Sequence, residues 1–137
     1  VEQLSGDPKL EVASYSTSLA ALESCEATTA VASSYSSVGF LFNIQGKYTD
    51  AERLYERCQA IDEKCFGPEH PHVATTLNNR AELLRAQGKY DDAEPLYVRA
   101  IAIGEKALGP EHPDLAVWLN NRAELLRMQV RAARTFQ

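Results

Sequence analysis

Between Gln45 and Gln87 the chain reads QGKYTDAERLYERCQAIDEKCFGPEHPHVATTLNNRAELLRAQ. This stretch returns 42 residues later as QGKYDDAEPLYVRAIAIGEKALGPEHPDLAVWLNNRAELLRMQ, which ends at Gln129. The two copies align without a gap and differ at 13 of 43 positions, so 30 positions are identical. Chance does not produce such a match. The chain therefore contains a tandem repeat with a period of 42 residues.

A fainter copy precedes these two. Residues 31–34 (VASS) lie 42 positions before residues 73–76 (VATT), and we therefore expect a degenerate half-repeat over about residues 29–46. A weaker correspondence continues upstream, where Val12 and Leu19 occupy the positions of apolar residues in the first full copy. The repeat pattern thus extends over most of the chain.

Each copy predicts two helices. Its apolar residues advance by three and four positions, which places them on one face of a helix. Gly46 and Gly88 stand where a helix would stop in a left-handed turn. Gly67 and Gly109, each followed by proline, end the next helix because proline cannot continue it. We expect helices at about residues 8–24, 29–45, 49–65, 71–87, 91–107 and 113–129 or beyond. Stacked helix hairpins of this kind form an all-α solenoid.

Composition and charge narrow the function classes. The chain has 137 residues, 14 Lys+Arg, 19 Asp+Glu and a net charge of −5, with 45% hydrophobic residues. This composition is that of a soluble globular protein. The acidic balance argues against a nucleic-acid binder and against a polybasic membrane-surface protein. No stretch reaches the ~20 apolar residues of a membrane-spanning helix. We find no signal-peptide pattern and expect a cytoplasmic protein. Because the chain starts at Val1, we expect a piece of a longer array.

Three cysteines are too few for a disulfide framework. Cys58 and Cys65 fall on one expected helix, where seven residues at 1.5 Å each place them ~10 Å apart, too far to bridge. The third, Cys25, lies well upstream. We therefore expect reduced thiols.

The motifs together resemble a known family. Residues 77–83 and 119–125 follow the pattern Leu-Asn-Asn-x-Ala-x-Leu, and Gln-Gly-Lys-Tyr, Ala-Glu-x-Leu-Tyr and Gly-Pro-Glu-His-Pro recur at fixed spacing. Over about residues 29–129 this resembles the 42-residue tetratricopeptide repeat of kinesin light chains and nephrocystin-like proteins. The resemblance implies a right-handed α-solenoid of antiparallel hairpins, with about 2.5 repeats and an N-terminal helix. Its expected parts are a cap (1–28), a degenerate repeat (29–66), a repeat (71–108), a half repeat (113–129) and an extension (130–137).

The resemblance also implies a non-catalytic scaffold that binds proteins or peptides. In such arrays the first helix of each repeat, helix A, lines a concave groove. Carried over by position, the peptide-binding residues would be Phe40, Asn43, Asn78, Glu82, Arg85, Asn120, Glu124 and Arg127. An Asn amide can both donate to and accept from an extended backbone. An Arg guanidinium can pair bidentately with a carboxylate of the ligand.

Some of these residues allow a second interpretation. Glu82 and Glu124 each precede an arginine by three positions, so the alternative is that they form surface ion pairs worth ~0.2–0.5 kcal/mol. Arg80 and Arg122 depart from the family, which usually has an aliphatic residue there. Two structural roles compete for them. Either the arginine stem packs while its guanidinium reaches the edge, or the guanidinium pairs with an acid on the second helix of a repeat, helix B.

We expect neither a metal site nor catalysis. The run from Glu69 to His72 places a carboxylate and two imidazoles close together, but a zinc site needs three or four converging ligands. We interpret these residues, and their copy at 111–114, as loop and helix-start residues, with Asp114 and the proline ring fixing the first turn. The chain has no phosphate-binding glycine loop and no nucleophile in a strained turn. We therefore predict no cofactor and no enzyme activity.

Three features concern the ends of the array. Residues 27–46 carry no charge, which favours a helix buried on several sides; the alternative is an exposed apolar surface around Phe40 and Phe42. Trp118 is either an interface anchor or a core residue. An uncapped solenoid end exposes apolar surface, so two copies could form a homodimer through their ends.

The sequence thus predicts a protein-binding or peptide-binding scaffold, which docks an extended segment in the groove of the A helices. The alternative is a structural or oligomerising segment of a larger array in a signalling or innate-immunity-type receptor.

Overall fold

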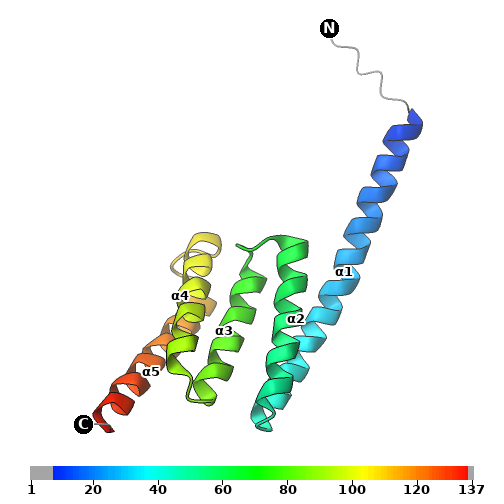
Figure 1. Cartoon of the computed structure of the whole chain (residues 1–137). Coiled ribbons are helices and arrows are strands. Elements are labelled where there is room, and N and C mark those ends of the chain that lie inside the picture. The colour runs from blue at the N-terminus through cyan, green and yellow to red at the C-terminus, as the bar shows by residue number, and fades with distance from the viewer. Residues whose placement is uncertain (1–7, 136–137) are drawn as a thin grey trace.

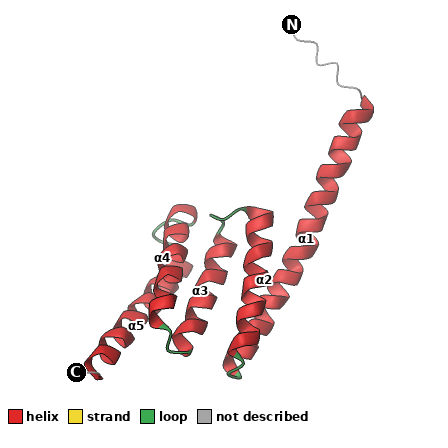
Figure 2. Cartoon of the chain, in the orientation of Figure 1, coloured by secondary structure: helices red, strands yellow, loops and turns green. Residues whose placement is uncertain are grey.

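A computed structural model describes the backbone of residues 8–135 and the side chains of residues 25–135. The described chain consists of five α helices and contains no strand (Figures 1 and 2). They are α1 (Pro8–Ile44), α2 (Tyr48–Phe66), α3 (Pro71–Ala86), α4 (Tyr90–Ala107) and α5 (Pro113–Thr135). α1, α3 and α5 are A helices, and α2 and α4 are B helices. The expected all-α fold is confirmed.

Glycines close the turns from helix A to helix B. Gly46 has a φ of 76°, a left-handed conformation that costs a residue without a Cβ little. There the Lys47 N–H donates to the Phe42 carbonyl at 2.8 Å, and the Gly46 N–H donates to the Asn43 carbonyl at 3.0 Å. This pair of bonds is a Schellman motif, which satisfies the last carbonyls of a helix. The same motif recurs at Gly88, so both turns follow from the repeated Gln-Gly-Lys-Tyr.

Histidines begin the A helices after the Gly-Pro-Glu-His-Pro turns. His70 Nδ1 accepts a hydrogen bond from the His72 N–H at 3.1 Å, and His112 Nδ1 accepts one from the Asp114 N–H at 3.1 Å. The expected loop and helix-start role of these residues is therefore confirmed. We expected Asp114 and the proline ring to fix the first turn of α5, and there the Asp114 N–H is capped by the His112 side chain. The described residues contain no group of three or more His, Cys, Asp or Glu side chains that could hold a metal ion.

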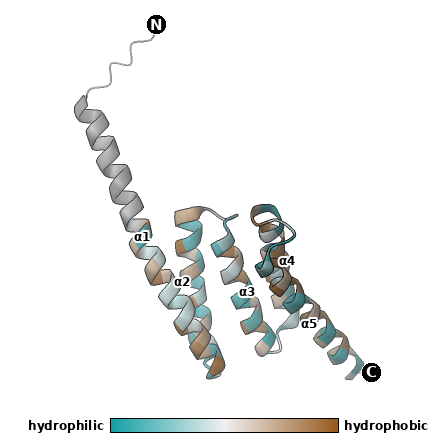
Figure 3. Ribbon diagram, turned by 180° about the vertical axis from the view of Figure 1, so that it is seen from behind, coloured by the Kyte–Doolittle hydropathy of each residue, from teal (hydrophilic) through white to brown (hydrophobic). Residues whose placement is uncertain are grey.

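The helices stack in chain order (Figure 1). Each packs against its sequence neighbours, and α3 also contacts both α1 and α5. The A helices therefore form one continuous layer, with the B helices beside it. Viewed from behind, hydrophobic (brown) and hydrophilic (teal) segments are interspersed along the coloured part of each helix (Figure 3). The core between the two layers is formed mainly by the side chains of Tyr55, Val73, Leu77, Leu83, Tyr97, Ile103, Leu115 and Leu125.

The expected break between helices 8–24 and 29–45 is wrong, because α1 is one helix from Pro8 to Ile44. Residues 25–28 contain neither glycine nor proline, so nothing in their backbone chemistry stops the helix. Its N-terminal half extends beyond the rest of the stack (Figure 1). Consequently no helix upstream of it in the described part of the chain covers the second half of α1. Val31, Val38 and Leu41 are 43%, 40% and 53% exposed, so the expected burial of the uncharged stretch is also wrong.

The expectation of reduced cysteines is wrong for two of the three. Cys25 of α1 and Cys65 of α2 form a disulfide, with their Cα atoms 5.6 Å apart. Sequence spacing along one helix did not show this pair, because the antiparallel packing of α1 and α2 brings together residues 40 positions apart. Cys58 is free and buried. Disulfides are rare in the cytosol, so this bond gives no support to the predicted cytoplasmic location.

No described helix has the length and apolar character needed to cross a membrane.

The disulfide predicts a redox-dependent stability. Reduction should lower the free energy of unfolding by about 2–4 kcal/mol, because the bond restricts a loop of 40 residues in the unfolded chain. Urea denaturation followed by circular dichroism, with and without a phosphine reductant, measures this difference. The Cys25→Ser/Cys65→Ser variant is the control and should be insensitive to the reductant. Equal stability of the oxidised and reduced wild-type chain would contradict the prediction.

Candidate binding groove

Asparagines link successive A helices. The Asn121 amide of α5 donates to Asn78 Oδ1 of α3 at 3.2 Å, and the Asn79 amide donates to Ser36 Oγ of α1 at 3.4 Å. Both bonds join residues 43 positions apart, so they are the same contact in successive repeats. Asn78 is only 7% exposed. Its side chain therefore lies within the contact between α3 and α5, and not free on the surface as the predicted backbone clamp requires.

Glu82 lies at the centre of a polar network. Arg85 Nη2 contacts Glu82 Oε2 at 2.5 Å, and the hydroxyl of buried Tyr97 from α4 donates to Glu82 Oε1. Arg85 also approaches Met128 Sδ of α5 at 3.7 Å. Burial, and secondly the hydrogen bond from Tyr97 to the Glu82 carboxylate, raise the pKa of Tyr97 above its ordinary value. The hydrogen bond to Glu82 raises the pKa of Arg85. Glu82 and Arg85 thus tie α3 to α4 and α5.

The corresponding pair on α5 is open to solvent. Arg127 Nη1 lies 2.9 Å from Glu124 Oε2, and the side chains are 74% and 42% exposed. Such a pair is worth less than about 1 kcal/mol, so either partner can exchange it for a ligand. Asn120 is also exposed. On α1, Phe40 is 57% exposed and Asn43 is half-buried.

Arg80 and Arg122 have a structural role. Arg80 of α3 contacts Glu52 of α2 at 2.5 Å, and Arg122 of α5 contacts Glu94 of α4 at 2.8 Å. Of the two roles considered, pairing with an acid on helix B is therefore the one observed. The second carboxylate oxygen of each glutamate is buried without a hydrogen bond, so the arginine supplies the main compensation for burying that charge.

Trp118 belongs to the core and is 4% exposed. It packs on α4 where Gly104 leaves space. A Cβ added at Gly104 would lie 2.6 Å from Trp118 Cζ3. The interpretation of Trp118 as an interface anchor is therefore wrong, because α5 directs this ring towards the preceding helix B.

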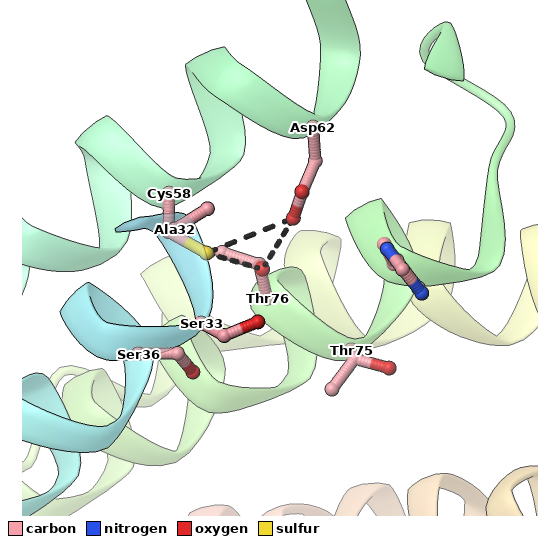
Figure 4. Close-up of a pocket in the computed structure, with 8 residues that line it drawn as sticks. Ala32, Ser33, Ser36, Cys58, Asp62, Thr75 and Thr76 are labelled. Carbon is pink, nitrogen blue, oxygen red and sulfur yellow. Dashed lines mark hydrogen bonds between the residues drawn. The ribbon is translucent and has the colours of Figure 1, made fainter. Parts of the chain in front are cut away.

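A cavity of about 150 Å³ opens between α1, α2 and α3 (Figure 4). Its floor contains three buried side chains, Cys58 and Asp62 of α2 and Thr76 of α3, which are joined by hydrogen bonds. Burial raises the pKa of the Cys58 thiol, which therefore stays protonated at neutral pH. The cavity is further lined by Ala32, Ser33, Ser36, His72 and Thr75.

Sequence reasoning missed the contacts between repeats. It assigned the first Asn of each Leu-Asn-Asn to a ligand and gave no role to Asn79 and Asn121, although the repetition of both was visible. It also missed Asp62 and Tyr97, because their hydrogen-bond partners Thr76 and Glu82 lie on another helix, α3. The one sign of the cavity in the sequence was that the first copy has Asp62 where the second has Gly104.

The geometry defines a class of protein, an α-solenoid of stacked antiparallel helix hairpins. A family model described as the tetratricopeptide repeat matches residues 30–104 and 72–134. The chain belongs to this family, as its motifs predicted.

A solved structure has the same fold. It is the crystal structure of nearly identical TPR-like repeats assigned to a Podosopora anserina kinesin light chain, which matches with a TM-score of 0.67 and 23% identity. The match covers 75% of this chain and 49% of that chain, so the present sequence spans about half of the matched structure. No curated protein sequence matches.

Tyr97 provides a test of the Glu82 network. Tyr97→Phe removes a hydrogen bond to a charged group and should lower the free energy of unfolding by about 1.5–3 kcal/mol. Tyr55, buried at the same position one repeat earlier, is the matched control, because the counterpart of Glu82 there is Phe40. Urea denaturation of Tyr97→Phe and Tyr55→Phe measures both changes. A loss for Tyr55→Phe as large as that for Tyr97→Phe would contradict the assigned network.

Proposed function

We propose that this chain is a non-catalytic scaffold that docks an extended peptide segment along its A helices. Tetratricopeptide repeats are generally protein-interaction scaffolds. The observation that carries the proposal is the continuous layer of α1, α3 and α5, in which the A helices contact one another directly. Such a layer offers one surface long enough for an extended chain, while each B helix is packed between two A helices.

The chemistry of the exposed side chains supports a ligand of mixed character. Phe40 offers an apolar ring, Asn120 an amide, and Glu124 and Arg127 charges of both signs. Asn43, half-buried on α1, adds a second amide towards the other end of this surface. An amide hydrogen-bonds a peptide backbone, and the charged pair selects side chains. A purely acidic or purely basic segment would meet repulsion from one member of that pair.

Within this proposal the eight residues divide into two groups. Asn120, Glu124, Arg127, Asn43 and Phe40 contact the ligand directly. Asn78, Glu82 and Arg85 hold α3 against its neighbours and so fix the spacing of the surface. A ligand reaches them only at their exposed edges, because the side chains of Glu82 and Arg85 are 25% and 26% exposed.

Binding of selected peptides tests the surface. Peptides are first selected on the wild-type chain from a random display library, and their affinities are then measured by fluorescence polarisation. Asn120→Ala/Arg127→Ala should weaken binding at least tenfold, or about 1.4 kcal/mol. Arg57→Ala, an exposed change on helix B α2, is the control and should leave affinity unchanged.

Asn78→Ala separates the two groups. It should lower stability by about 1 kcal/mol because it removes the bond from Asn121, and it should affect affinity less than the double variant. Unchanged affinity in Asn120→Ala/Arg127→Ala, with its circular dichroism intact, would contradict the groove assignment. An equal loss in Arg57→Ala would place the ligand elsewhere.

A second candidate function, association through the ends of the stack, is favoured by two uncovered stripes. Val31 and Leu41 of α1 are exposed, whereas their counterparts one repeat later, Val73 and Leu83, are fully buried. At the other end, Leu119 of α5 is 44% exposed although its counterpart Leu77 is fully buried. Among the described helices, no helix B precedes the first stripe and none follows the second. In this second proposal another copy of the chain covers them, as further repeats would in a longer array.

Light scattering at high protein concentration tests this association. We expect a mass about twice the 15.1 kDa of one chain for the wild type. Leu126 of α5 is also exposed, at 42%. Val38→Lys/Leu41→Lys at one end and Leu119→Lys/Leu126→Lys at the other should each weaken the dimer, because each buries charge without a partner. A monomeric wild-type mass would rule out self-association.

A further inference from the structure

The cavity between α1, α2 and α3 is present in the first repeat and absent from the same place in the second, although the two repeats are nearly identical. Where the first repeat has Asp62 and Thr76, the next has Gly104 and Trp118. In the second repeat the indole of Trp118 fills the space above Gly104, at a distance that leaves no room for a Cβ. In the first repeat the same space stays open and is polar. The space is closed in the second repeat because the large Trp118 faces Gly104, and it is open in the first repeat because Thr76 and Asp62 stand at these positions.

Asp62 at the floor of the cavity has no salt-bridge partner among the described residues, although burial lowers the pKa of the His70 imidazole and the charge of Asp62 partly opposes this, and His72 also lines the cavity. Asp62 is 4% exposed, and its Oδ2 accepts hydrogen bonds from Thr76 Oγ1 at 3.4 Å and Cys58 Sγ at 3.6 Å. Both are neutral donors at long distance. Among the described residues no Lys, Arg or His lies within salt-bridge distance of Asp62, whereas the partly buried Glu52 and Glu94 each pair with an arginine. A buried carboxylate without a cation is costly, and a cation from outside would relieve that cost.

The groups around the opening suit a primary ammonium. Figure 4 shows Asp62 directed from α2 towards Thr76, with Ser33 and Ser36 on the adjoining face of α1. An ammonium has three N–H donors and needs acceptors such as these carboxylate and hydroxyl oxygens. A volume of about 150 Å³ corresponds to roughly five water molecules. It therefore has room for an ammonium and the methylene groups next to it.

The position of the cavity connects it to the proposed ligand surface. Thr75 and Ser33, which line it, belong to two neighbouring A helices. A segment docked along the A helices therefore passes the opening and can insert one side chain between α1 and α3.

We propose that this cavity binds the ammonium group of a lysine side chain from the docked segment, with Asp62 as its counter-ion. This inference rests on the proposed peptide-binding function and assigns it a specificity pocket. The next repeat lacks the pocket because Trp118 fills it, so the array reads a lysine at one place only among its described repeats.

A small amine tests the pocket without any peptide. Wild-type chain labelled with ¹⁵N is titrated with n-butylammonium chloride, and n-butanol is the neutral control of the same shape. We expect amide shifts localised at residues 33, 36, 75 and 76 with the amine and not with the alcohol. Asp62→Asn keeps the shape of the floor, removes its charge, and should abolish the shifts. Absent shifts, or equal shifts with butanol, would overturn the proposal and leave a cavity that holds water only.

A second variant copies the neighbouring repeat. Cys58→Ala/Asp62→Gly/Thr76→Trp installs the residues that pack together at positions 100, 104 and 118, and thermal unfolding by circular dichroism verifies its fold. Library-selected peptides should carry a lysine whose replacement by norleucine weakens wild-type binding at least tenfold. The same replacement should have no effect in the triple variant or in Asp62→Asn.

The results separate this inference from the function on which it rests. Peptides that bind the A helices without a lysine preference would overturn the pocket and leave the peptide-binding function intact. Selective binding of butylammonium with no peptide binding would overturn the function and support the pocket as an amine site. A lysine preference that survives in both variants would place the ammonium at another carboxylate, and would overturn the proposal.

Discussion

The stack depends on one tyrosine in each B helix, which packs between two A helices. Tyr55 lies against Gly39 of the preceding helix and in one cluster with Leu83 of the following one. Tyr97 clusters in the same way with Ala81 and Leu125. The residue that faces the tyrosine from the preceding helix A, Gly39 or Ala81, must be small, because the tyrosine ring occupies the space that a longer side chain would need. Each ring therefore sets the distance between successive A helices, and the continuous layer follows.

Once that spacing is set, polar contacts fix the register of the helices. The Arg80–Glu52 and Arg122–Glu94 pairs join helix A to the preceding helix B, and the asparagines join helix A to helix A. Buried ion pairs contribute little net stability, but breaking one leaves an uncompensated charge. These contacts thus penalise slippage of one helix along another, and the apolar core supplies most of the cohesion.

The two ends and the first repeat differ from the regular pattern, and those differences carry the functional proposals. α1 runs straight where a regular array would turn, which leaves Val31 and Leu41 exposed. α5 ends the described stack without a helix B on its outer side. Between the first and second repeats, Asp62 and Thr76 keep open a space that Gly104 and Trp118 close. A scaffold of repeated units acquires specificity at such positions, because the identical positions provide only the common surface.

The sequence by itself determined the repeat, the all-α fold and nearly all the turns. The repeat of 42 residues is visible in the order of the residues. The helices and the glycine turns depend on residues that are close together in the chain, so they can be predicted from it. Only the tertiary structure decided that Cys25 meets Cys65, that Asn78 is held by Asn121, and that the uncharged stretch of α1 is exposed. Each of these depends on which helix packs opposite the residue. The two contacts join residues about one repeat apart in the chain, at separations of 40 and 43 positions. The sequence pattern showed that the helices stack, but it did not show which side chains would face each other between them.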